Sequence, residues 1–165
     1  MDRKIITDAL EIIPILINGY NKNANVLNAA KRKVYAYARY IGTIDDAEKT
    51  RQLSLMLNHE HVYVKYWGGV IALSYNVMKK QALVTLISIL DTEIIPSKDA
   101  VNFQRNLQLN LLKADVECVL YDYKKYGLIG SYPEQYADKY SPSIFPNAGH
   151  AIKYFRRMIK KSADF

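Results

Sequence analysis

Residues 57–75, LNHEHVYVKYWGGVIALSY, carry the strongest structural signal in this chain. From about Val62 to Tyr75 the apolar residues recur every three to four positions, a spacing that predicts a helix. The short link Asn76–Val77 follows, and a second run with the same spacing continues from about Met78 to Leu90. We therefore expect a helical hairpin within about residues 53–90.

Two adjacent glycines, Gly68 and Gly69, stand in the middle of the first of these helices. Each glycine costs a helix about 1 kcal/mol relative to alanine. Close contact with neighbouring helices, or a kink, should compensate for this cost, because a residue without a side chain allows a close approach.

The same stretch resembles a bacterial HEAT-like repeat. Val64-Lys65 stands where the repeat usually has Val-Arg, Gly68-Gly69 where it has a small pair, and Ala72-Leu73 where it has Ala-Leu. The wider region from about Val26 to Gly127 is similar to a family of small uncharacterised bacterial proteins with one such repeat. The resemblance implies an all-α fold of the α-α superhelix kind, in which flanking helices cap a single HEAT-like hairpin. It implies no specific activity.

Helical spacing also extends through most of the remaining sequence. We predict helices over about Asp2–Asn18, interrupted at Pro14, over Ala24–Ile41, over a short stretch ending near Asn58, from about Pro96 to Tyr126, and over Gly149–Lys161. Gly42 and Gly127 are suited to the left-handed position that ends a helix. Asp45 predicts a capped helix start, with Glu48 answering it across the first turn.

One apolar stripe of the long helix is expected to face the core, because its members recur every three to four residues. It comprises Phe103, Leu107, Leu111, Ala114, Cys118 and Tyr121. At 165 residues, we expect one all-helical domain over 1–165. Residues from about 130 to 165, where Ser131–Glu134 is typical of a capped helix start, are then an appendage, because so short a segment buries little core alone.

Composition excludes several classes of protein. The chain has 50% hydrophobic and 24% charged residues, which is not a disordered composition. No apolar run approaches the ~18 residues that span a bilayer, and the N-terminus is not typical of a signal peptide. Its one cysteine, Cys118, excludes an intrachain disulfide. We expect a cytoplasmic protein of bacterial type.

Motifs for catalysis are missing from the sequence. It has no glycine-rich phosphate loop, no nucleophile elbow and no cysteine with a patterned histidine, so we expect neither enzymatic activity nor a cofactor. His59 and His61 bracket Glu60, but a helical metal site needs two histidines four residues apart, so we expect no metal. His150 is expected at the surface or as a cap.

Two aspartates seven residues apart, Asp115 and Asp122, share one face of the predicted long helix. Paired carboxylates can act as acid and base when their environments separate their pKa values. The simpler interpretation is a solvated stripe with Lys113 and Lys125 nearby.

The net charge of +7 is concentrated in two places, the cluster Lys31-Arg32-Lys33 and the end of the chain. Lys153, Arg156, Arg157, Lys160 and Lys161 share one side of the predicted last helix, with Ile152, Phe155 and Ile159 on another. Such a stripe can neutralise phosphates, bind an anionic membrane surface or meet an acidic protein, or it can be an ordinary solvated face.

Fourteen tyrosines are more than a core needs, and many lie between residues 121 and 140. Tyrosine is enriched at protein interfaces and also stacks on nucleobases. Packing of the appendage onto the long helix is the simpler interpretation of most of these rings.

Our leading hypothesis is a non-enzymatic protein-interaction module, for example an immunity protein that binds and neutralises a cognate bacterial toxin. This hypothesis rests on analogy at the level of the fold. Its candidate partner-binding residues are Asp115, Asp122, Tyr123, Tyr126, Tyr132 and Tyr136. The alternative is a nucleic-acid-binding HEAT-like protein that uses Lys153, Arg156, Arg157 and Lys160.

Overall fold

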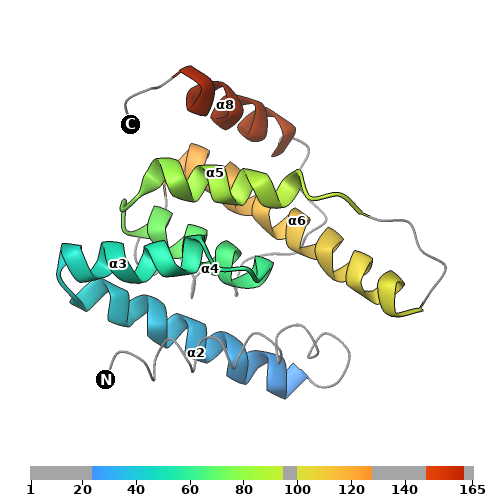
Figure 1. Ribbon diagram of the computed structural model, residues 1–165, viewed down its shortest axis with the longest axis horizontal. Coiled ribbons are helices and arrows are strands. Elements are labelled where there is room, and N and C mark those ends of the chain that lie inside the picture. The colour runs from blue at the N-terminus through green and yellow to red at the C-terminus, as the bar shows by residue number, and fades with distance from the viewer. Residues whose placement is uncertain (1–23, 95–99, 128–147, 162–165) are drawn as a thin grey trace.

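A computed structural model describes residues 24–94, 100–127 and 148–161 (Figure 1). The described part of the chain is all-α, as the sequence predicts. Its helices are α2 (Ala24–Thr43), α3 (Asp46–Leu57), α4 (Val62–Ser74), α5 (Lys79–Leu90), α6 (Ala100–Tyr126) and α8 (Ala148–Lys161). The helices predicted over Asp2–Asn18 and from Ser131 lie outside the described residues.

The predicted hairpin is formed by α4 and α5, which pack side by side in opposite directions (Figure 1). The turn between them begins with Asn76, whose φ of 58° is left-handed. The Asn76 amide donates to the Leu73 carbonyl at 3.2 Å, and the Val77 amide donates to the Ala72 carbonyl at 2.9 Å. This pattern is a Schellman motif, which satisfies the last carbonyls of α4 and reverses the chain.

The helices form a stack in which α2 lies at one end, α3 beside it, the hairpin in the middle and α8 at the other end, while α6 crosses behind α5 (Figure 1). Within the stack α4 is buried almost all round, and Val70, Ile71, Ala72 and Leu73 are at most 1% exposed. A helix that is apolar on every side belongs inside a protein. Packing around α4 therefore forms the core.

The two glycines of α4 lie against different neighbours. A Cβ at Gly68 would lie 2.7 Å from Met56 Cβ of α3, and a Cβ at Gly69 would lie 2.7 Å from Leu86 Cγ of α5. Cβ atoms in proteins essentially never come within 3.0 Å of such neighbouring atoms. The prediction that close packing compensates for these glycines is confirmed.

Gly42 does not end its helix in the way the sequence predicts. It lies inside α2, which continues to Thr43, and among the described glycines only Gly127 has a positive φ, of 68°. Instead, a Cβ at Gly42 would lie 2.7 Å from the Tyr75 hydroxyl, which donates to the Ala38 carbonyl at 2.8 Å. Gly42 therefore makes room for a tyrosine that joins the end of the hairpin's first helix to α2. Gly127 does end α6, as predicted.

A chain of polar side chains links α2 to α3. Asp45 caps α3 by accepting a 2.9 Å hydrogen bond from the Glu48 amide, as predicted. The Glu48 carboxylate, however, accepts from Arg51 and from Gln52 at 2.5–2.6 Å instead of turning back to Asp45, and these bonds lower its pKa to about 2. The buried Gln52 in turn accepts a 3.0 Å hydrogen bond from Tyr37 of α2. These bonds satisfy polar groups that would be costly to bury alone.

The stripe predicted to face the core on α6 is wrong at Leu107 and is not the side of the helix that is buried most deeply. Leu107 is 50% exposed, and Leu111, Ala114 and Tyr121 are only partly buried, although Cys118 is buried. The side of α6 that enters the core carries Leu112, Val116, Val119 and Leu120. Leu112 follows Leu107 by five residues, about 140° around a helix of 3.6 residues per turn. Because α6 is apolar on two sides, spacing alone does not show which side meets α5 and α8.

The two glycines should respond differently to alanine. At Gly68 the nearest atoms include the backbone of Met56 and Leu57, whereas at Gly69 they belong to the Leu86 side chain. We expect G68A to destabilise the protein by about 1–3 kcal/mol net, since overpacking against a backbone forces a helix to shift. We expect G69A to cost less, because a leucine rotamer can adjust. Urea unfolding followed by circular dichroism measures both.

Gly149 supplies the control, because a Cβ there would meet nothing within 4 Å. G149A should be neutral or stabilising by up to about 1 kcal/mol. A G68A protein as stable as G149A would contradict the close approach of α3 and α4.

Candidate functional site

The last helix, α8, is amphipathic and is held by its apolar side. Ala151 and Phe155 are at most 2% exposed, and α8 packs on both α6 and α5. The Phe155 ring stacks on Tyr123 of α6, with ring centroids 5.7 Å apart and an angle of 26° between the planes. Such a pair contributes about 0.5–1.5 kcal/mol beyond the burial of area. The orientation of α8 on the stack is therefore defined by its buried residues.

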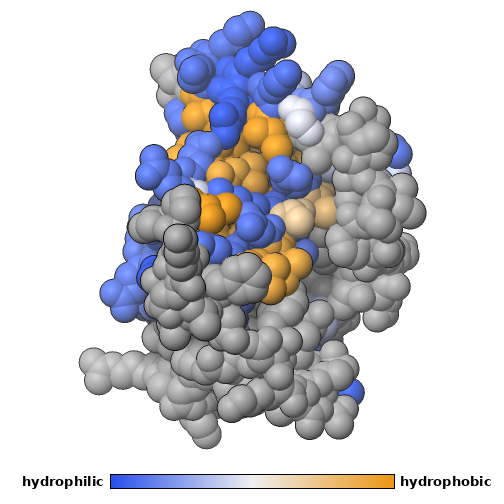
Figure 2. Space-filling view, turned by 90° about the vertical axis from the view of Figure 1, so that its right-hand side faces the viewer, coloured by the Kyte–Doolittle hydropathy of each residue, from blue (hydrophilic) through white to orange (hydrophobic). Residues whose placement is uncertain are grey.

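The opposite side of α8 is basic and exposed. We call it the basic face, and it comprises Lys153, Arg156, Arg157, Lys160 and Lys161. Figure 2 shows hydrophilic side chains covering the top of the molecule, where α8 lies in Figure 1. Within residues 24–94, 100–127 and 148–161, Arg156 is the member of this face that forms an ion pair, with Asp91 at the end of α5. The predicted basic stripe is thus presented to solvent by the fold.

A tyrosine and a lysine extend the basic face towards α6. Tyr154 is 45% exposed, and the ammonium of Lys124 lies 4.9 Å from its ring centroid. The Tyr154 ring also meets Phe155 edge to face, at 5.1 Å and 74°. Sequence reasoning missed both residues. They are thirty positions apart, and nothing in the local pattern of either indicates the contact.

The residues predicted for protein binding on α6 do not form one surface. Asp122 is 4% exposed and Asp115 is partly buried, so the interpretation of these two as a solvated stripe is wrong for Asp122. Tyr123 is partly buried and stacks on Phe155, whereas Tyr126 is 69% exposed with Lys125 over its ring at 4.8 Å. Asp115, Asp122 and Tyr126 share one side of α6, because they are seven and four residues apart, but they range from buried to exposed and so do not form one open surface. Tyr132 and Tyr136 lie outside the described residues.

The two histidines of the turn before α4 act as backbone acceptors. His59 Nδ1 accepts from the His61 amide at 3.0 Å, and His61 Nδ1 accepts from the Tyr63 amide at 3.3 Å, so that His61 caps α4. Burial, together with the neighbouring His59, lowers the pKa of His61 from its ordinary value of 6.5. Within the described residues no group of three or more histidine, cysteine or acidic side chains is arranged to hold a metal ion. His150 is exposed, as predicted.

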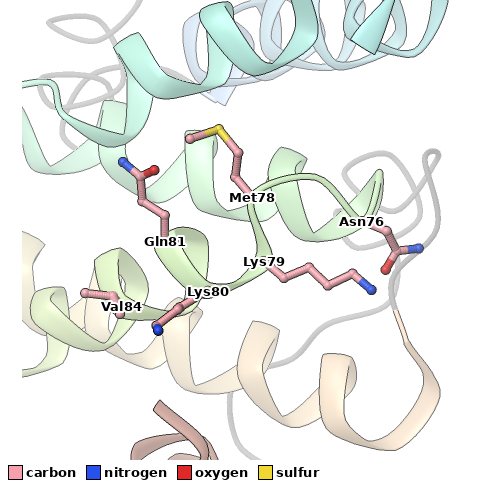
Figure 3. A pocket seen from close by; sticks show the side chains of 6 residues that line it. All are labelled: Asn76, Met78, Lys79, Lys80, Gln81 and Val84. Carbon is pink, nitrogen blue, oxygen red and sulfur yellow. The ribbon is translucent and has the colours of Figure 1, made fainter. Parts of the chain in front are cut away.

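A hollow of about 760 Å³ opens beside the turn between α4 and α5. It is lined by Asn76, Met78, Lys79, Lys80, Gln81 and Val84. Figure 3 shows these side chains spreading in different directions around the turn. Because they do not converge, the hollow does not present a set of polar groups to one ligand.

No protein family, curated protein or solved structure was found to match this chain. Among the described helices, none is both long and apolar enough to cross a bilayer. The basic face of α8 is therefore the candidate site on physical grounds alone.

The histidine cap should make stability depend on pH. Because the pKa of His61 is lower in the folded protein than in the unfolded chain, its contribution is complete above about pH 6.5 and is lost as pH falls through the folded value. We expect Tm to fall between pH 7 and pH 5. H61N should reduce this fall, since asparagine also caps helices but does not titrate. Differential scanning calorimetry at several pH values measures the change.

H150N is the matched control, because it replaces an exposed histidine of α8 that lies outside the cap of α4. Glu48 does not contribute in this pH range, because its carboxylate has an ordinary pKa of 4.5 and a pKa of about 2 in the folded protein. If H61N and the parent protein lose the same Tm between pH 7 and pH 5, the cap does not titrate as we infer.

Proposed function

We propose that this protein is a non-enzymatic interaction module that binds a negatively charged partner, in the first place a protein, through the basic face of α8. The observation that carries this proposal is the exposure of five cations on one side of a helix whose other side is anchored on α5 and α6. An anchored helix presents its charges in a constant arrangement, which lowers the entropy lost on binding. Complementary charge also speeds association and favours the right partner.

The architecture is compatible with this role. A hairpin stacked between further helices is the arrangement that the resemblance to HEAT-like repeats implies, and stacked repeats serve as rigid binding surfaces. An immunity protein that neutralises a bacterial toxin is a concrete form of the proposal, supported by analogy alone. The proposed partner-binding residues are therefore on α8 and not on α6, because Asp122 is buried and the partly buried Tyr123 ring stacks on Phe155.

Nucleic-acid binding is the second candidate, and the same face supports it. Lys153, Arg157 and Lys160 lie on one exposed side of α8, a pattern that can neutralise successive phosphates. Such binding would weaken steeply with salt and would show little dependence on protein partners.

Charge reversal on the basic face tests the proposed function. We expect K153E/R157E to reduce recovery of the partner from the native lysate about tenfold or more, a loss of about 1.4 kcal/mol or more in binding. The measurement is an affinity pull-down with the tagged full chain, read by mass spectrometry with and without nuclease. A partner that is still recovered after nuclease treatment supports the hypothesis of a protein partner. A partner that is lost after nuclease treatment supports nucleic-acid binding.

R32E is the matched control. Arg32 is an exposed cation of α2, at the opposite end of the stack from α8 (Figure 1). Circular dichroism should show that all three proteins keep their helical content. If K153E/R157E and R32E recover the partner equally well, the basic face is not the binding site.

A further inference from the structure

We infer that the partner of the basic face is an acidic protein surface that binds through carboxylate side chains, and that Lys124 and Tyr154 belong to the binding site. This inference rests on the proposed function and narrows it to one class of partner. Three features of the described residues bear on the choice between carboxylates and a phosphodiester chain, and the second and third favour carboxylates.

The first feature is a carboxylate already bound at the edge of the face. Arg156 pairs with Asp91 of α5, and both side chains remain about half exposed. Arginine and lysine side chains are donors only, and a guanidinium group can pair in a bidentate manner with a carboxylate, as it can with a phosphate. Asp91 therefore shows, within this chain, the kind of ligand that the α5 edge of the face accepts.

The second feature is the packing of the Tyr154 ring, at the edge of the basic face that adjoins α6. Proteins that bind single-stranded nucleic acid stack bases on open aromatic faces. Here the Tyr154 ring has the Lys124 ammonium over it at 4.9 Å, and it packs against Phe155. Base stacking on that side would displace the lysine. A carboxylate instead accepts hydrogen bonds from a phenol and an ammonium without disturbing their contact.

The third feature is the polarity of α8. Phosphate groups are commonly bound at helix N-termini, where backbone amides point outward and the helix dipole is positive. Lys160 and Lys161 stand instead in the last turn of α8, where the dipole is negative. The face thus offers side-chain cations without the backbone donors that a phosphate chain usually uses.

The dimensions of the face agree with a short acidic segment. Lys153 and Lys161 are eight residues apart, about 12 Å along the helix axis. Carboxylates four residues apart on a partner helix are about 6 Å apart, so two turns of such a helix match the length of the face. Lys124 adds a further cation beside it.

Fluorescence anisotropy with two labelled probes tests this inference on the full chain. The probes are a 20-residue poly-L-glutamate and a 20-nucleotide oligo(dT), each at 50 mM and 200 mM NaCl. We expect the chain to bind poly-L-glutamate more tightly than oligo(dT) at both salt concentrations. K153E/R157E should weaken peptide binding at least tenfold.

Two lysines of α6 provide a matched pair. K124A should weaken binding of poly-L-glutamate about threefold, because Lys124 adjoins α8 through Tyr154. K125A should leave binding unchanged, because Lys125 lies over Tyr121 and Tyr126 of its own helix. Y154F should weaken binding, because the phenol hydroxyl of Tyr154 donates to the partner in this inference, and Y126F is its control; equal binding by the two variants would remove Tyr154 from the site.

The outcomes separate this inference from the proposed function. Tighter binding of oligo(dT), abolished by K153E/R157E, would overturn the acidic-protein inference while the basic face kept its role. No binding of either probe at 50 mM NaCl would overturn both. Equal losses in K124A and K125A would remove Lys124 from the site.

Discussion

The approach of α4 to its two neighbours at Gly68 and Gly69 is the constraint on which the other contacts depend. One glycine admits the backbone of α3 and the other admits the Leu86 side chain of α5. A larger residue at Gly68 would push against the backbone of α3, and one at Gly69 would displace the Leu86 side chain of α5. Both changes are costly because the core is densely packed. The helix gives up stability by carrying two glycines, about 1 kcal/mol each, and the close contact with both neighbours offsets it.

The position of α8 follows from this arrangement. Because α5 is fixed against α4, it lies beside α6, and the two helices together accept the apolar side of α8. Phe155 enters against Tyr123, and Arg156 meets Asp91 at the end of α5. With its apolar side buried, α8 turns its other cations to solvent. An exposed ion pair contributes only about 0–1 kcal/mol, so burial of the apolar side, more than charge, orients the helix.

Local patterns in the sequence were sufficient for some features and not for others. The hairpin follows from the apolar spacing along its two helices, while the cap at Asp45 and the stop at Gly127 each depend on residues within one turn. All three features are present. Gly42 was misread because a glycine that ends a helix and one that admits a distant tyrosine are alike in sequence. The core side of α6 was misread because the helix has two apolar sides, and only its neighbours choose between them. Asp122 is buried against the expectation of a solvated side chain, because the sequence does not show which side of α6 its neighbours cover.

Helix periodicity and capping act between residues three or four apart, so local sequence is enough to predict the helices and the amphipathic character of the last one. The same spacing places Lys153, Arg156, Arg157 and Lys160 on one side of that helix. Local sequence does not show which tyrosines and aspartates are buried, or that Lys124, Tyr154 and Asp91 flank the basic face. Burial and cation contacts depend on which helices pack together, and that packing brings together residues far apart in the chain.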